Sequence, residues 1–162
     1  MQSRILRFMV IGVVFMPQFL FAQKRISVLL ETVGVMAVQG VYLTYMSIGA
    51  AADGNSKKTY SDEMTIKLMS EFIRIAQVAK AQLKKLISTK AVVGDDVAFV
   101  RDLGITYKLL IDEATGYNDY LKNKNDKDSN VKIEKLNEYL DNYTKNRKKA
   151  WKKIRKLHGG SN

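Results

Sequence analysis

Apolar residues recur at alternating intervals of three and four along three long segments of this chain. In the segment 61–88 they are Met69, Phe72, Ala76, Ala79, Leu83 and Leu86, and in 95–122 they are Val100, Leu103, Tyr107, Leu110, Ala114, Tyr117 and Leu121. The segment 131–157 repeats the pattern with Ile133, Leu136, Leu140, Tyr143, Arg147, Ala150, Ile154 and Leu157. Residues three and four apart share one face of a helix, so each segment is predicted to be a helix with one apolar stripe.

A fourth segment, 26–52, is apolar on nearly every side. Glu31 is its only charged residue, and the twenty residues from Val33 to Ala52 carry no charge. A helix of this kind is either the buried central helix of a bundle or a membrane span. Polar residues near its middle, such as Gln39 and Thr44, favour the buried helix, while the membrane span stays open as the alternative.

The segments between these helices are short and polar, which favours antiparallel neighbours. Ser61 is predicted to cap the helix that follows it, with Asp62 and Glu63 in the first turn. No strand-like alternation or hairpin turn pair interrupts the pattern. The sequence therefore predicts an all-α fold, an antiparallel up-down-up-down four-helix bundle with helices at 26–52, 61–88, 95–122 and 131–157.

The N-terminus reads as a secretory signal. Arg4 and Arg7 precede an apolar run from Phe8 to Phe21, and the small residue Ala22 follows it. Cleavage near Ala22 would leave 23–162 as a single helical domain, periplasmic or secreted. The alternative is an uncleaved inner-membrane protein with two apolar spans and a basic cytoplasmic helical hairpin, acting as an assembly or secretion component.

Positive charge is concentrated in the last predicted helix. The chain has a formal net charge of +11, and the stretch 145–156 contains eight basic residues and no acidic one. The candidate contacts for an anionic surface are Lys145, Lys148, Lys149, Lys152, Lys153, Arg155 and Lys156. The partners that fit are anionic lipid headgroups or an envelope protein, with a second copy of the chain also kept open. No nucleic-acid-binding motif accompanies these residues, and a solvated face is the plainer alternative.

Arg147 interrupts the apolar stripe of the last helix, where an unpaired charge is costly. Glu31 is the single acid of the apolar first helix, and an antiparallel arrangement brings these two residues to neighbouring levels. We therefore predict a structural ion pair between Glu31 and Arg147 that fixes the register of the helices. The alternative is that Arg147 extends outward to solvent.

The sequence contains no motif that indicates a catalytic site. The chain has no cysteine, His158 is its only histidine, and it has no glycine-rich phosphate loop. Asp126, Asp128 and Asn130 resemble the start of a calcium loop, but Val131 occupies the glycine position and the closing glutamate is missing. We therefore expect a non-enzymatic envelope protein with a structural or interaction role, without metal or cofactor.

Aromatic residues line the apolar stripes of the last two predicted helices. They are Tyr107, Tyr117, Tyr139, Tyr143 and Trp151. Core packing is the expected role of these rings. The alternative is a groove between helices that accepts an apolar ligand.

Overall fold

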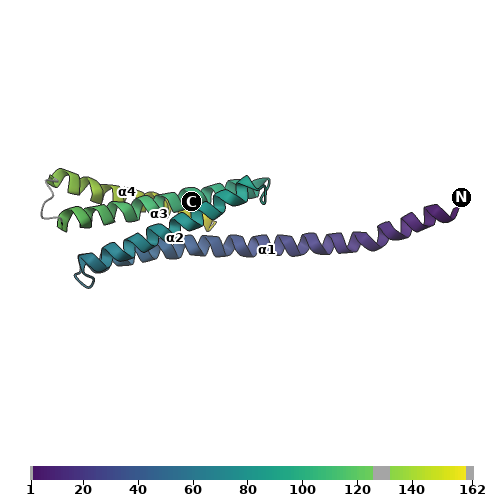
Figure 1. Ribbon diagram of the computed structural model, residues 1–162, viewed down its shortest axis with the longest axis horizontal. Coiled ribbons are helices and arrows are strands. Elements are labelled where there is room, and N and C mark those ends of the chain that lie inside the picture. Colours follow the sequence, from purple (N-terminus) through teal and green to yellow (C-terminus); the bar gives the residue numbers. More distant parts are fainter. Residues whose placement is uncertain (1, 126–131, 160–162) are drawn as a thin grey trace. The chain divides into compact units, whose positions relative to one another are not determined.

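The computed structural model describes residues 2–125 and 132–159, and these residues form four helices (Figure 1). Helix α1 spans Gln2–Ser56, α2 spans Asp62–Ser88, α3 spans Asp95–Asn125 and α4 spans Ile133–Leu157. The described part of the chain contains no strand, and α3 packs against both α2 and α4. The all-α character and the packing of four helices are therefore confirmed. The residues of the calcium-like loop lie outside the described ranges.

The chain divides into two compact units, 1–37 and 38–162. The boundary falls within α1, between Ala37 and Val38, and the packed helices belong to the second unit. The sequence placed the start of the mature domain at Gln23 instead, and cleavage near Ala22 stays a prediction. The sequence predicted that this helix begins at residue 26. That start is wrong, because α1 continues through 23–26 without a break.

Helix α3 contributes the largest share of the core. All seven residues of its predicted stripe are buried, namely Val100, Leu103, Tyr107, Leu110, Ala114, Tyr117 and Leu121. Thr106, Glu113 and Asn118 are buried as well, so α3 is covered on more than one face. This breadth reflects its neighbours, since α3 contacts α1, α2 and α4 through the residue pairs described below. The central helix of the second unit is therefore α3.

Helix α1 is buried on one side of its C-terminal part. Val41, Ile48, Ala51 and Ala52 are in the core, whereas Leu43 is 61% exposed and Met46 is exposed too. The expectation that the apolar first helix is the enclosed one is therefore wrong. By length and composition, the stretch Glu31–Ser56 is able to cross a membrane, and 22% of its most apolar window is buried.

Specific contacts join the helices of the second unit. The Tyr117 hydroxyl lies 3.1 Å from the carbonyl oxygen of Ala52, which links α3 to α1. Asn118 Nδ2 donates to Ser70 Oγ of α2 at 3.4 Å. Lys153 Nζ of α4 donates to Asp102 Oδ1 of α3 at 2.6 Å. These contacts fix the levels at which the helices meet.

The predicted cap of α2 is present. Ser61 Oγ accepts a hydrogen bond from the Met64 backbone N–H at 3.1 Å, and Asp62 and Glu63 lie in the first turn. Helix α4 ends at Leu157 with basic residues in its last turn, and Gly159 follows with φ +80°. Glycine adopts this left-handed conformation without steric cost, so it suits the end of a helix.

Close packing of α3 on α4 depends on Gly116. A methyl group at this position would lie 3.0 Å from the carbonyl oxygen of Tyr139 and from the backbone nitrogen of Tyr143. Because both atoms belong to the backbone, Gly116→Ala must push the two helices apart. We expect a loss of about 1–3 kcal/mol in the free energy of unfolding, measured by chemical denaturation.

Gly104 of α3 provides the matched control for this substitution. A methyl group there would meet no atom within 4 Å. Gly104→Ala is expected to raise the free energy of unfolding by about 0.5–1 kcal/mol, because alanine favours the helix. Equal effects of the two substitutions would contradict the close approach at Gly116.

Candidate functional site

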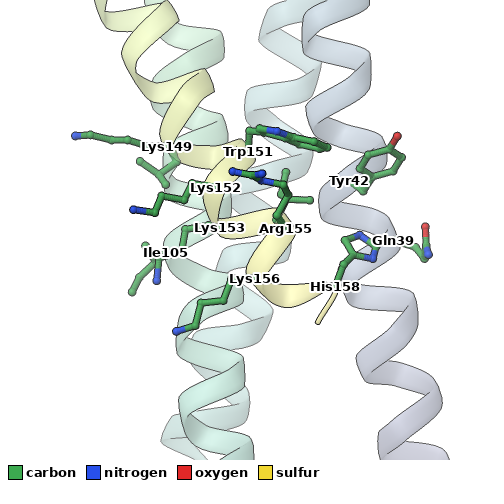
Figure 2. A pocket seen from close by; sticks show the side chains of 12 residues that line it. Gln39, Tyr42, Ile105, Lys149, Trp151, Lys152, Lys153, Arg155, Lys156 and His158 are labelled. Carbon is green, nitrogen blue, oxygen red and sulfur yellow. The ribbon is translucent and has the colours of Figure 1, made fainter. Parts of the chain in front are cut away.

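A groove of about 1320 Å³ lies at the C-terminal end of α4, between α4, α1 and α3. Lys153 is paired with Asp102, so α4 has one more turn before it ends, while α3 continues for seven residues towards Asp95. The end of α4 therefore leaves surfaces of α1 and α3 uncovered. Figure 2 shows the side chains that line this space, with Gln39 and Tyr42 on α1 and Ile105 on α3.

Five cationic side chains of α4 line the groove. They are Lys149, Lys152, Lys153, Arg155 and Lys156, all of which the sequence singled out as candidate contacts for an anionic surface. Lys145 and Lys148 are exposed on the same helix but do not line the groove. The structure thus brings five of the seven candidates together and leaves two outside.

The wall and floor of the groove are apolar and aromatic. Tyr42, Ile105, Leu109, Trp151 and Ile154 supply this surface from α1, α3 and α4. The Tyr42 and His158 rings pack edge to face with centroids 5.9 Å apart. In Figure 2, Trp151, Arg155 and His158 lie on the side of Tyr42, whereas Lys149, Lys152 and Lys156 extend on the side of Ile105.

One acidic residue lies beside the groove. Asp102 accepts a hydrogen bond from Lys153 at 2.6 Å, and Lys156 Nζ lies 3.7 Å from its other oxygen. The hydrogen bond from Lys153 lowers the pKa of Asp102, so this carboxylate is charged at neutral pH. Lys153 is thereby largely neutralised, and the remaining cations keep their charge available.

A second polar cluster lies inside the bundle, where Arg147 of α4 meets Glu113 of α3. Arg147 Nη1 donates to Glu113 Oε1 at 2.7 Å and also to the carbonyl oxygen of Tyr45 at 3.2 Å. The guanidinium lies 4.1 Å from the centre of the Tyr45 ring, which is a cation–π geometry. Gly49 makes room for it, because a methyl group there would overlap the guanidinium.

Glu113 is fully buried, with 0% of its surface exposed. Its second carboxyl oxygen, Oε2, has no hydrogen-bond partner among the described residues. Burial raises the pKa of Glu113 to about 7, although the hydrogen bond and charge of Arg147 act in the opposite direction. A buried carboxyl group with one unpaired oxygen is thus close to its protonation midpoint at neutral pH.

The sequence predicted Glu31 as the acidic partner of Arg147, but the acidic partner in the structure is Glu113. Glu31 belongs to the first unit, and its pairing with Arg147 stays a prediction. Arg147 does not extend outward to solvent, since its guanidinium is paired with Glu113 and its side chain is 27% exposed.

Sequence reasoning missed Glu113, yet a signal was present. Lys108 lies four residues before Asp112 and pairs with it at 2.6 Å. Glu113 has no basic residue three or four positions away, because Leu109, Leu110, Gly116 and Tyr117 occupy those sites. An acid without a local partner, flanked by a stripe of buried residues, is a candidate for a partner on another helix.

Among the described residues, no group of three or more histidine, cysteine, aspartate or glutamate side chains is arranged to hold a metal ion. Comparisons with protein-family models, with curated proteins and with solved structures found no match for this chain. The groove is therefore the feature from which a function can be inferred.

Proposed function

We propose that this protein is a non-enzymatic helical bundle of the cell envelope that contacts an anionic membrane surface through the basic end of α4. The observation that carries the proposal is the groove of five cations with an apolar floor. Lysine and arginine near an anionic membrane contribute about 1 kcal/mol each. Aromatic side chains such as Tyr42 and Trp151 suit the boundary between headgroups and acyl chains.

The path of the chain also supports this end of the bundle as the membrane contact. The second unit begins at Val38, and the next residue, Gln39, already lines the groove. The chain therefore enters the second unit at the same end of the bundle as the basic residues of α4. A chain that leaves a membrane at this point brings Lys149, Lys152 and Lys156 close to the headgroups.

An uncleaved membrane anchor is the second candidate, and exposed apolar side chains favour it. Val28, Leu29, Val33, Val35 and Met36 of α1 are each at least 48% exposed. Exposed apolar surface of this extent suits a lipid environment or a partner. As an uncleaved anchor, the protein stays in the inner membrane. As an exported protein, it is periplasmic or secreted after cleavage near Ala22.

An antiparallel up-down-up-down topology is part of the proposal. Along α1, Tyr45 stacks on Trp151 with centroids 5.6 Å apart, while Tyr42 meets His158 further along α4. Along α3, Asp102 meets Lys153 and Glu113 meets Arg147. In both pairs of helices the residue number rises in one helix as it falls in the other, which supports antiparallel neighbours.

Hydrogen exchange on nanodiscs tests the membrane contact whether or not the N-terminal helix is retained. We expect backbone amides of 149–158 to exchange more slowly when the full-length protein is bound to discs with anionic lipid than to discs of phosphatidylcholine alone. The triple variant Lys149→Gln, Lys152→Gln, Lys156→Gln is expected to remove this difference, since it deletes three exposed charges but spares the Lys153–Asp102 pair.

The matched control changes three exposed lysines of α2, namely Lys67→Gln, Lys80→Gln and Lys84→Gln. This variant should behave like the unmodified protein, and raising the salt to about 1 M should weaken the anionic effect. Exchange in 149–158 that is the same on both kinds of disc would refute the proposed contact.

Cell fractionation with N-terminal sequencing distinguishes the two locations. A protein that begins at Gln23 in the soluble envelope fraction supports export with cleavage. An intact N-terminus in the inner-membrane fraction supports the anchored version, and recovery of the intact chain from the cytosol contradicts both.

A further inference from the structure

The groove combines a cationic rim with an apolar interior, and contact with a flat anionic surface requires only the cations. Its rim carries Lys149, Lys152 and Arg155, and among the described residues no acidic side chain lies within ion-pair distance of these three. The acidic residue beside the groove, Asp102, is held by Lys153 with a weaker contact to Lys156. The rim therefore presents unneutralised positive charge.

The interior of the groove is apolar and belongs to three helices. Ile105 is 47% exposed and lies between the side chains of Lys152 and Lys156 in the view of Figure 2. Leu109, one turn further along α3, also lines the groove. Exposing an isoleucine side chain to water is unfavourable. A hydrocarbon chain whose polar end reaches the lysines would remove this apolar surface from water.

We infer that the groove binds one anionic phospholipid, with the phosphate held between Lys152 and Lys156 and an acyl chain lying on Ile105 and Leu109. This inference rests on the proposed function and adds to it a discrete site with a stoichiometry of one. Charge complementarity selects an anionic headgroup, because the groove lining contains five cations and no acidic residue. The exposed apolar surface of Ile105 beside the lysines selects a lipid over a free phosphate ion.

Trp151 can report on the occupant, since it lines the same groove and is the single tryptophan of the chain. Bromine atoms on an acyl chain quench tryptophan fluorescence at short range. We therefore expect phosphatidylglycerol with brominated chains, added to the full-length protein in nonionic detergent, to quench Trp151 saturably at one lipid per protein. Brominated phosphatidylcholine is expected to quench weakly and without saturation.

Two variants separate the headgroup contact from the chain contact. Lys152→Gln with Lys156→Gln should weaken the apparent affinity by about tenfold or more. Ile105→Glu should abolish saturable quenching, because it removes apolar surface and adds a negative charge inside the groove. The matched control is Ile75→Glu, which alters an isoleucine of α2 that is 49% exposed and should leave the titration unchanged.

Inorganic phosphate distinguishes a phosphate site from a lipid site. Competition by millimolar phosphate that matches the lipid would overturn the chain contact. Equal quenching by both brominated lipids, or quenching without saturation, would overturn the discrete site. A partner protein or a second copy seated in the groove would show as an absence of quenching, with protection of the groove in the absence of lipid, and that outcome also overturns the inference.

The two experiments give different results if only the lipid site is absent and if the whole membrane contact is absent. If the groove holds no lipid but the surface contact exists, slow exchange of 149–158 on anionic discs persists while Ile105→Glu and the unmodified protein quench alike. If the surface contact itself is absent, neither readout responds to the loss of Lys149, Lys152 and Lys156.

Discussion

Replacing Arg147 with methionine is expected to lower the free energy of unfolding by about 3 kcal/mol at about pH 9. Glu113 is 0% exposed, and Arg147 supplies the hydrogen bond that its Oε1 receives. Without the guanidinium, a carboxylate is left buried in an apolar core with no compensating charge. The same substitution also removes the bond to the Tyr45 carbonyl and the contact with the Tyr45 ring.

The size of this loss should depend on pH. At about pH 5 Glu113 is protonated in both proteins, so the variant loses about 1 kcal/mol for the missing hydrogen bond. As the pH rises, the unmodified protein ionises Glu113 against Arg147, whereas the variant must keep its carboxyl protonated or bury an unpaired charge. Chemical denaturation of the full-length protein in nonionic detergent at several pH values measures this difference.

Two further variants make the result specific. Arg147→Met combined with Glu113→Gln should recover most of the stability lost at high pH, because no buried charge remains to be paired. Arg101 of α3 is exposed, so Arg101→Met serves as the control and should change stability little. A double variant no more stable than Arg147→Met alone at high pH would show that the ion pair is not the cause.

The stability of the unmodified protein is expected to fall by about 3 kcal/mol between pH 4.5 and pH 7. Burial raises the pKa of Glu113 from 4.5 to about 7 in the folded state. The folded protein therefore binds a proton that the unfolded chain releases in this range. Its contribution is fully present below pH 4.5, is lost as the pH rises through about 7, and stays constant above it.

Asp102 does not interfere in this window. The hydrogen bond from Lys153 lowers its pKa below 3.8, so the stability that it contributes is present above that pH and is lost only in stronger acid. The difference in free energy of unfolding between the unmodified protein and Glu113→Gln isolates the glutamate, since other groups titrate equally in both. A difference that does not change between pH 4.5 and pH 7 would rule out a raised pKa of Glu113.

The helices were predictable because their stripes follow the physical period of a helix. All seven stripe residues of α3 are buried, and α2 and α4 begin within two residues of their expected starts. Local periodicity specifies such elements without knowledge of the neighbours. It does not say which helix is enclosed, because that depends on how many partners each helix meets.

The same limit explains the two largest differences between expectation and structure. Helix α1 is more apolar than α3, yet Leu43 and Met46 of α1 are exposed while the polar Thr106 and Glu113 of α3 are buried. Apolar composition alone therefore selected the wrong central helix. The partner of Arg147 was missed because an ion pair between helices depends on register, which no single helix encodes.

The cationic residues of the groove could be predicted from the sequence, but its apolar floor could not. The cluster of lysines on α4 is visible in the sequence, and five of its seven members line the groove. The apolar floor is not visible, because Tyr42, Ile105 and Leu109 come from helices far apart in the chain. They line one groove because α4 ends before it covers them.

The end of α4 thus separates stability from binding capacity. Gly159, with its φ of +80°, marks where the helix stops, and a methyl group there would contact no atom of the described structure within 4 Å. The residues that hold the bundle together, such as Ala150 and Ile154, precede this point. Extending α4 by one turn, about 5.4 Å, would therefore narrow the groove and leave the core intact. Evolution can in this way adjust what such a bundle accepts through a change at its terminus.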